Sequence, residues 1–193
     1  MLNIAIIIGS TRPGRVGEGV AKWVYEVVQK RTDAKFELVD IKKFDLPLLD
    51  EPVSAAMSAN YTKPHTKRWS QTIAAFDAFV FVTPEYNHGI PAALKNAIDF
   101  LYGEWNHKAA GFVSYGGAGG VRSVEQLRLV MAEIQVSAVR SQLPLSLFTD
   151  FVNYQELQPT ARHERAVHTL IDELIVLGEV MKNFRMGAKE KAA

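Results

Sequence analysis

The chain has 193 residues, no cysteine and a formal net charge of +1, from 22 lysines and arginines against 21 aspartates and glutamates. This length suits one domain, expected over residues 1–185, with a disordered tail at 186–193. The balanced charge argues against nucleic-acid binding, and the missing cysteines exclude disulfides and cysteine-based metal sites. No apolar run reaches the ~20 residues of a membrane span and no signal peptide is recognisable, so we expect a cytoplasmic protein without membrane contact.

Five stretches predict strands buried on both faces of a sheet, because they are apolar, partly β-branched and mostly bounded by turn-type residues. They lie at residues 2–8, 36–41, 78–83, 109–115 and, more weakly, 137–145. Helical spacing of apolar residues occurs between and after them, at residues 20–28, at 90–101, after Gly120 and over 167–181. Strands that alternate with helices are typical of a parallel sheet covered on both faces, so the chain predicts an α/β fold.

One long segment interrupts this alternation. Residues 44–64 carry three prolines, at Pro47, Pro52 and Pro64, and predict an irregular excursion with a short helix around residues 54–59. Excursions of this length often border a functional site. Two tryptophans nearby in the sequence are interpreted as packing residues, with a wall of the site as the alternative; they are Trp69 and Trp105.

The loop after the first strand predicts an anion site. Gly9-Ser10-Thr11-Arg12 leads into a helix near Gly17, so backbone N–H groups, hydroxyls, a guanidinium and the positive start of a helix converge. The glycines of this region do not form the dinucleotide fingerprint, and Arg15-Val16 stands where a P-loop requires lysine and serine or threonine. NTP hydrolysis is therefore disfavoured. Taken alone, the loop fits an ordinary strand-to-helix turn equally well.

Two further loops are expected beside the first one. Residues 84–89, Pro-Glu-Tyr-Asn-His-Gly, follow the third strand, and residues 114–120, Ser-Tyr-Gly-Gly-Ala-Gly-Gly, follow the fourth. In open parallel sheets, ligands bind beyond the carboxyl ends of the strands, where the strand order reverses. One loop offers an aromatic side chain and amide groups, and the glycines of the other let backbone approach a flat ring closely.

The motif Gly9-Ser10-Thr11-Arg12, followed by Pro84-Glu85-Tyr86-Asn87 and by the sequence IPAALKNAID from Ile90, resembles the NADPH-dependent FMN reductase family. That family includes quinone, azo-dye and chromate reductases. The resemblance covers residues 2–134. It implies a flavodoxin-like fold, in which a doubly wound five-stranded parallel sheet has helices on both faces, together with non-covalent FMN and a homodimer or homotetramer.

The resemblance also implies which residues bind FMN. For the phosphate they are Ser10, Arg12 and the backbone of Arg15, Val16 and Gly17. At the last three positions the chain departs from some relatives, which carry further hydroxyls there. The isoalloxazine ring is expected against Pro84, Glu85, Tyr86 and Asn87. Its other edge is expected against Ser114, Tyr115, Gly116 and Gly117.

The expected function is an NAD(P)H-dependent oxidoreductase that passes hydride from nicotinamide through FMN to an acceptor: a quinone, an azo compound, free flavin or a metal oxyanion. The flavin itself accepts the hydride, so no side chain is assigned as catalytic and Glu85 is given a binding role. His88 is interpreted as a solvent-facing loop residue, with proton delivery to a bound quinone as the open alternative. The spacing of His163 and His168 predicts no metal site. The choice between NADPH and NADH stays open; candidates for binding a 2′-phosphate are Lys95, Lys108 and Arg122.

Two alternative functions are also considered. A flavodoxin-type electron carrier would bind FMN without reacting with nicotinamides, but such carriers tend to be strongly acidic, whereas this chain is balanced. A regulatory or assembly protein on the same fold would have a vestigial phosphate site. The presence of Ser10, Arg12 and residues 84–87 counts against that alternative.

Overall fold

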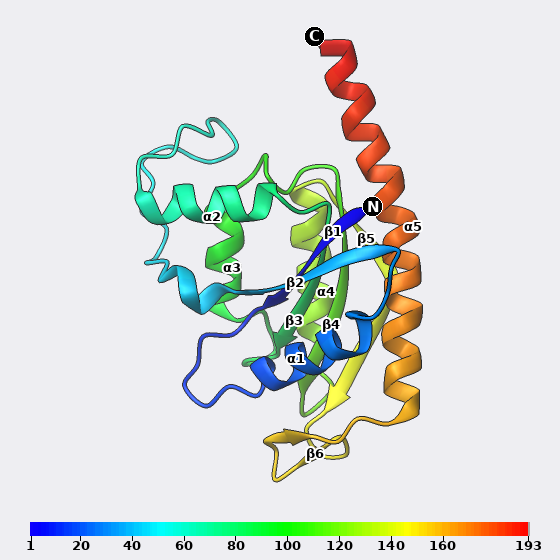
Figure 1. The fold of residues 1–193 in the computed structure, drawn as a ribbon. Helices are drawn as coiled ribbons and strands as arrows, with labels where there is room; N and C mark the ends of the chain where they lie inside the picture. Colours follow the sequence, from blue (N-terminus) through cyan, green and yellow to red (C-terminus); the bar gives the residue numbers. More distant parts are fainter. Residues whose placement is uncertain (193) are drawn as a thin grey trace.

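A computed structural model describes residues 1–192, with side chains through residue 188. Its centre is a five-stranded sheet in the order β2-β1-β3-β4-β5, in which all neighbouring strands are parallel (Figure 1). The strands are β1 (Leu2–Ile8), β2 (Ala34–Asp40), β3 (Ala78–Pro84), β4 (Lys108–Gly116) and β5 (Val136–Ser146). The predicted α/β fold is therefore confirmed, and every predicted strand lies within about two residues of its expected ends.

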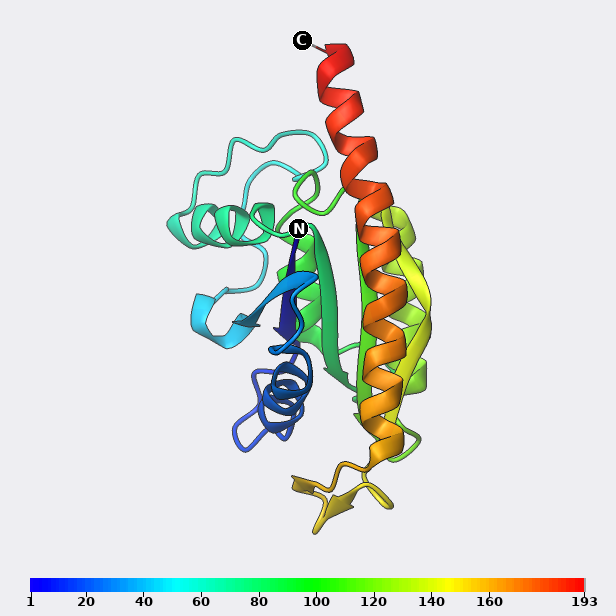
Figure 2. The ribbon, with the colours of Figure 1, turned by 45° about the vertical axis from the view of Figure 1, so that its right-hand side comes forward.

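Helices cover both faces of this sheet (Figure 2). Those on one face are α1 (Gly17–Val28) and α5 (Ala161–Ala192). Those on the other face are α2 (Pro64–Ala74), α3 (Ala92–Asp99) and α4 (Val121–Glu133). The remaining elements are a 3-10 helix, η1 (Ile41–Phe44), and a small antiparallel hairpin of β6 (Phe151–Val152) and β7 (Glu156–Leu157). In both views the C-terminal part of α5 extends beyond the rest of the chain.

Side chains of the central strands alternate between two hydrophobic cores. In β1, Ile4 and Ile6 belong to the core beneath α1 and α5, whereas Ala5 and Ile7 belong to the core beneath α2, α3 and α4. Burial on both faces requires apolar residues at successive positions, which is why these strands are recognisable as unbroken apolar runs. Within residues 1–192, no helix has the length and apolar character needed to span a membrane.

Two tryptophans pack in the core beneath α2, α3 and α4. Trp69 in α2 and Trp105, which precedes β4, are both almost completely buried. Their indole N–H groups donate to the carbonyl oxygens of Ala97 (2.7 Å) and Ile98 (3.1 Å) in α3. Large apolar surfaces are thereby buried without an unpaired donor, and the interpretation of both residues as packing residues is confirmed.

Two segments differ clearly from the sequence-based expectation. α2 is not predicted because only Thr66, Trp69 and Ile73 are buried along its length, too few positions for a recognisable helical stripe. The short helix expected around residues 54–59 is wrong, because the segment forms only a turn closed on the Ser54 carbonyl. Met57 in this turn is 84% exposed, so no buried face stabilises a helix.

The ends of two helices also differ. α3 begins at Ala92, with Pro91 outside the helix as its cap residue, and is shorter than the predicted residues 90–101. α5 continues through residues 186–192, which the sequence predicts to be a disordered tail; residue 193 lies outside the described residues. Residues 188–192 are alanine, lysine and glutamate, all strong helix formers, so their helix propensity favours this extension.

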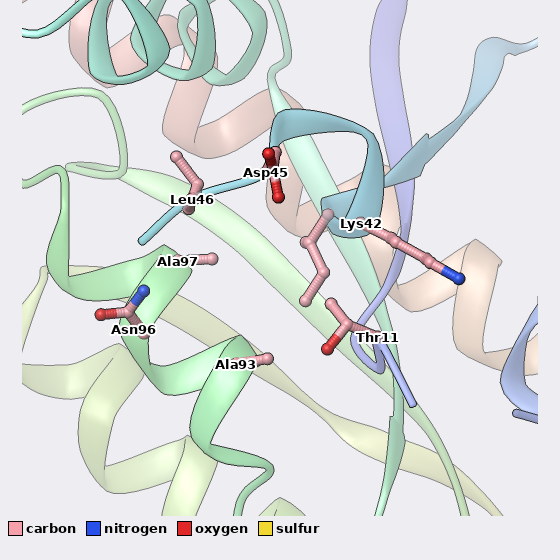
Figure 3. Close-up of a pocket in the computed structure, with 8 residues that line it drawn as sticks. Thr11, Lys42, Asp45, Leu46, Ala93, Asn96 and Ala97 are labelled. Carbon is pink, nitrogen blue, oxygen red and sulfur yellow. The ribbon is translucent and has the colours of Figure 1, made fainter. Parts of the chain in front are cut away.

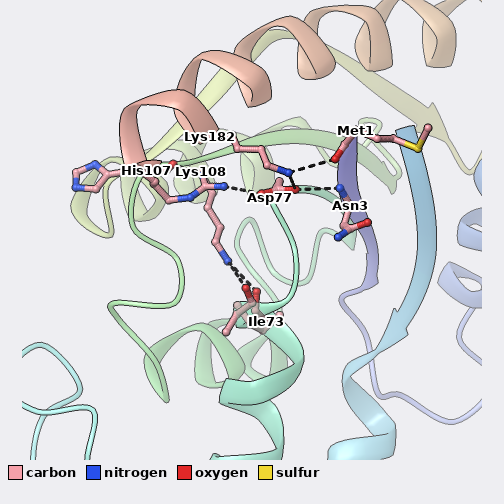
Figure 4. A network of polar contacts seen from close by, with 9 residues as sticks. Met1, Asn3, Ile73, Asp77, His107, Lys108 and Lys182 are labelled. Atoms are coloured by element: carbon pink, nitrogen blue, oxygen red, sulfur yellow. Dashed lines mark hydrogen bonds and ion pairs between the residues drawn. The ribbon is translucent and has the colours of Figure 1, made fainter. Parts of the chain in front are cut away.

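The amino edge of the sheet is closed by a network of ion pairs (Figure 4). The Asp77 carboxylate accepts hydrogen bonds from Lys182 Nζ (2.9 Å), from the Arg185 guanidinium (2.7 Å) and from the backbone N–H of Asn3 (3.1 Å). Burial raises the pKa of Asp77, but the hydrogen bonds outweigh it and the pKa lies below its ordinary value. The network thus ties α5 to the starts of β1 and β3.

Lys108, at the start of β4, lies beside this network (Figure 4). Its side chain is buried, and its Nζ donates to the carbonyl oxygens of Ile73 (2.8 Å) and Ala74 (3.5 Å) at the C-terminal end of α2. A cation at that position interacts favourably with the helix dipole. Burial, followed by the charge of Arg185, lowers the Lys108 pKa to about 7.

Candidate functional site

Three loops leave the sheet at its carboxyl edge, and they are called the site loops here. Their strands, β1, β3 and β4, are neighbours in the sheet. Hydrogen bonds at the starts of the loops hold them to the adjacent strands: Gly9 N–H donates to the Val82 carbonyl (2.8 Å), and Glu85 N–H donates to the Tyr115 carbonyl (3.1 Å). The predicted convergence is therefore confirmed for the first, second and third site loops, at residues 9–16, 85–91 and 117–120 respectively.

The first and second site loops are joined through side chains. The hydroxyls of Ser10 and Tyr86 lie 2.8 Å apart, and Ser10 is almost fully buried. The Arg12 guanidinium lies over the Tyr86 ring, 5.9 Å from its centroid, while Arg12 itself is exposed. Three predicted site residues therefore come together, and one of them presents a positive charge to solvent.

Arg15 has a different position from Arg12. Its guanidinium is buried and donates to both carboxylate oxygens of Asp40 (2.8 and 2.5 Å) and to the Ser10 carbonyl. The hydrogen bond to Asp40 raises the Arg15 pKa, which keeps the side chain charged. Its backbone N–H closes a turn on the Arg12 carbonyl (3.2 Å). Arg15 therefore shapes the loop, and Asp40, which sequence reasoning missed, neutralises its charge.

The start of α1 faces the first site loop without a side-chain cap. Val16 is the cap residue and supplies no acceptor for the first N–H groups of the helix, and Gly17 is the first helical residue. The opening N–H groups of a helix have no partner within it and carry a partial positive charge. This helix start therefore suits an anion, as the sequence predicts for Val16 and Gly17.

The second site loop contains a tight and well-supported turn. Tyr86 and Gly89 exchange backbone hydrogen bonds of 3.2 and 3.1 Å, and Asn87 and His88 between them both have positive φ, 48° and 70°. This is the geometry of a type I′ turn. Gln126 of α4 donates to the His88 carbonyl (2.9 Å) and fixes the turn from behind. A single polar residue on a helix offers no sequence signal of such a role.

Glu85 is occupied by contacts with α4. Its carboxylate accepts from the Arg122 guanidinium (2.5 Å) and from the Arg122 backbone N–H (3.1 Å) at the helix start. The side chain of Glu85 is almost buried, and the ion pair places a negative charge at the positive end of the helix dipole. The Glu85 side chain thus positions the second site loop against α4.

At the end of β4, just before the third site loop, the Ser114 side chain is turned inward. The residue is fully buried and its hydroxyl donates to the Gly119 carbonyl (2.7 Å). Gly119 and Gly120 have φ of 72° and 71°, and a Cβ at Gly120 would come within 2.8 Å of the Tyr115 nitrogen. Glycine is therefore required there, and Gly117 is the exposed residue among the four predicted at this edge.

A cavity of about 270 Å³ adjoins the site loops (Figure 3). It lies between Thr11 of the first site loop, Asp45 after η1 and Asn96 of α3. The Asn96 amide group donates to the Pro47 carbonyl (2.7 Å) and accepts from the Leu49 N–H (2.9 Å), so α3 anchors the start of the excursion. None of residues 84–87 lines this cavity, so of the three site loops only the first, through Thr11, borders it.

The three basic candidates for a nicotinamide 2′-phosphate are located very differently. Lys108 is excluded, because its ammonium is buried at the opposite edge of the sheet. Lys95 pairs with Asp99 one helical turn away on α3 (2.8 Å), and Arg122 pairs with Glu85 beside the second site loop. Among the described residues, no group of three histidine, aspartate or glutamate side chains is arranged to hold a metal ion.

The strand order 2-1-3-4-5, with a phosphate-type loop after β1, defines a flavodoxin-like α/β protein. A family model described as NADPH-dependent FMN reductase matches residues 2–150, which is most of the chain. The chain belongs to this family.

Individual relatives agree with the family match. An NAD(P)H-dependent FMN reductase of Nectria sp is 43% identical over 159 residues, which cover 78% of this chain and 79% of that protein. Another from Schizosaccharomyces pombe is 38% identical over 183 residues, covering 94% and 86%. Quinone reductases and an NADPH azoreductase are also similar. Among solved structures, the flavoenzyme NAD(P)H:acceptor oxidoreductase FerB of Paracoccus denitrificans superposes with a TM-score of 0.72, covering 94% and 99% of the two chains at 19% identity, a likeness in fold.

Proposed function

We propose that this chain is an NAD(P)H-dependent FMN oxidoreductase whose flavin binds across the three site loops. When bound, FMN accepts hydride from the nicotinamide and passes electrons to a second substrate. A quinone, an azo compound, free flavin or a metal oxyanion is the proposed acceptor class, supported by the similarity to reductases of the first two kinds. The observation that carries the proposal is the combination of an uncapped helix start with two adjoining loops at the reversal of strand order.

The first site loop fits the FMN phosphate. Ser10 supplies a hydroxyl, Arg12 supplies an exposed guanidinium, and Val16 and Gly17 open a helix whose N–H groups have no side-chain acceptor. A phosphate would satisfy these donors and would be favoured by the helix dipole. Arg15 contributes by holding the loop in shape, because its guanidinium is already paired with Asp40.

The second and third site loops are proposed to enclose the isoalloxazine ring. Pro84 to Asn87 would line it with backbone and with the Tyr86 ring, and Tyr115 to Gly117 would approach it with backbone. The side chains of Glu85 and Ser114 are engaged inside the protein, so both residues support the site by position. A rigid, glycine-rich frame suits a flat cofactor that performs the hydride chemistry itself.

The balanced charge of the chain favours the enzyme over the alternative, an electron carrier that binds FMN without reacting with nicotinamides, because such carriers tend to be strongly acidic.

We further propose that the protein is a cytoplasmic homodimer or homotetramer. Four apolar side chains of the excursion are at least half exposed, which supports a subunit contact there: Leu48, Leu49, Val53 and Met57. Sedimentation of the purified protein tests the oligomeric state.

The decisive experiment is a spectrum of the protein reconstituted with FMN, followed by anaerobic titration with NADPH and, separately, NADH. We expect a stoichiometric yellow complex whose flavin absorbance is bleached by at least one nicotinamide. A protein that bound FMN and stayed oxidised with both would be the electron carrier. A protein that bound no FMN would be neither.

A further inference from the structure

The hydroxyl of Tyr115 is a buried polar group without a hydrogen-bond partner among the described residues. Tyr115 is the last but one residue of β4, is 4% exposed, and its ring lies 6.5 Å from that of Phe151. A buried donor that makes no hydrogen bond costs free energy, so its persistence calls for a physical explanation. In a protein that binds a cofactor, one explanation is that the cofactor supplies the acceptor.

The hydroxyl lies at the start of α1. A Cβ placed on Gly17 would overlap the Tyr115 hydroxyl, so only glycine at position 17 leaves room for it. Gly17 is the first residue of α1, where the uncapped helix N–H groups point. The Tyr115 side chain therefore reaches from β4 to the start of α1, which follows the phosphate-type loop.

The electrostatic surroundings favour a neutral donor at this point. Burial, followed by the neighbouring Tyr86, raises the Tyr115 pKa; the nearby Ser10 hydroxyl, the Gly17 backbone N–H and Arg12 lower it by less. The pKa therefore lies above its ordinary value and the phenol keeps its proton. The nearby Ser10 hydroxyl is already engaged with Tyr86 at 2.8 Å. Arg12 supplies the opposite charge that a phosphate requires, and a buried O–H adds a hydrogen bond without adding charge.

We infer that the Tyr115 hydroxyl donates a hydrogen bond to the phosphate of FMN, and that Gly17 is glycine so that this hydroxyl can reach it. The inference rests on the proposed function and reassigns Tyr115 from the ring edge to the phosphate. Tyr115 is thereby a binding residue that the first-loop motif alone does not reveal.

The test compares the binding of two flavins to Tyr115→Phe and to the wild type. The flavins are FMN and riboflavin, which lacks the phosphate. Dissociation constants are measured by quenching of flavin fluorescence, and the thermal unfolding of the flavin-free protein is measured in parallel. We expect Tyr115→Phe to bind FMN roughly tenfold more weakly and riboflavin unchanged. The flavin-free variant should unfold at the same or a higher temperature, because a buried unpaired hydroxyl has been removed.

A second comparison introduces Gly17→Ala into the wild type and, separately, into the Tyr115→Phe variant. The added methyl collides with the hydroxyl in the wild type, and removal of that oxygen in Tyr115→Phe relieves part of the collision. The loss of FMN affinity caused by Gly17→Ala should therefore be smaller in the Tyr115→Phe background. Equal losses in the two backgrounds would contradict the packing relation.

The outcomes are distinguishable. If Tyr115→Phe retained wild-type FMN affinity, or weakened FMN and riboflavin alike while lowering the stability of the flavin-free protein, the hydroxyl would have an internal structural role and the inference would be wrong. If the wild type bound neither flavin, the proposed function would fall together with it. A selective loss of FMN binding supports both.

Discussion

The two edges of the sheet carry polar groups in opposite states. At the amino edge, Asp77 binds Lys182 and Arg185, and the Lys108 ammonium is bonded to the end of α2. At the carboxyl edge, the Arg12 guanidinium is exposed, and among the described residues the start of α1 has no side-chain cap and the Tyr115 hydroxyl has no hydrogen-bond partner. Paired groups hold the fold together, whereas unpaired donors gathered at one point indicate a ligand. Substitutions at the amino edge should therefore change stability, and those at the carboxyl edge flavin binding.

The largest effect is expected from Asp77→Ala at the amino edge. Removing the carboxylate leaves two partly buried cations without their partner, which should lower the free energy of unfolding by about 3 kcal/mol. Denaturant unfolding of the flavin-free protein measures this loss, and the FMN dissociation constant should stay unchanged. Asp33→Ala is the matched control, since its ion pair with Arg31 is at the surface and should be worth under about 1 kcal/mol. If Asp77→Ala and Asp33→Ala lowered the free energy of unfolding equally, the network at the amino edge would be worth no more than a surface ion pair.

Lys108 predicts a pH dependence of stability at the same edge. Its folded pKa, about 7, lies below its unfolded value, so between these two values the unfolded state binds more protons and stability rises with pH. At about 1.4 kcal/mol per pKa unit, this difference corresponds to a rise on the order of 3 kcal/mol between pH 7 and 10. Lys108→Met should flatten this rise in urea unfolding. A rise of the same size in Lys108→Met would show that another group titrates.

Arg12→Ala and Arg15→Ala separate the two roles within a single loop. Arg12→Ala should weaken FMN by roughly 10-fold or more, about 1.5–2 kcal/mol, without changing stability, because Arg12 is exposed and free to meet a phosphate. Arg15→Ala should instead lower stability, because it leaves Asp40 unpaired. Fluorescence quenching and thermal unfolding of both variants measure the contrast. If Arg12→Ala lowered stability but left FMN binding unaltered, the prediction would be wrong and the first site loop would be an ordinary strand-to-helix turn.

The smallest effect is expected from Glu85→Gln. The amide keeps an acceptor for the Arg122 N–H but loses the charge, so stability should fall by about 0.5–1 kcal/mol. The rate at which NADPH or NADH reduces the bound flavin should stay within about twofold at every pH, because Glu85 transfers no proton. A new pH dependence in stopped-flow reduction would make Glu85 an acid catalyst.

The strands and the site loops could be predicted because their signals are local. Burial on both faces produces unbroken apolar runs, and parallel strands bring their carboxyl ends to one edge whatever lies between them. The α2 helix could not be predicted, because few of its residues are buried and its stability comes from Trp69 packing under α3.

Side-chain roles were the least predictable part. Arg12 and Arg15 are three residues apart and alike in the sequence, yet a distant Asp40 neutralises only one of them. In the sequence, Lys108 and Lys95 are equal candidates for binding a 2′-phosphate, but the structure buries the Lys108 ammonium at the amino edge of the sheet. Both outcomes depend on contacts between residues far apart in the chain, which single-sequence patterns do not carry.

The hydrogen bond from Lys182 to the Met1 carbonyl joins positions 181 residues apart. β1 is an inner strand of the sheet, between β2 and β3, and is the first strand made, yet its amino end is held by a turn of α5 at Lys182 (Figure 4). Val167, Leu170, Ile171 and Leu174 of the same helix cover one face of the sheet. During synthesis, a chain made only as far as residue 160 therefore leaves the part of this core beneath α5 uncovered, so this face of the sheet is completed only after α5 has been made.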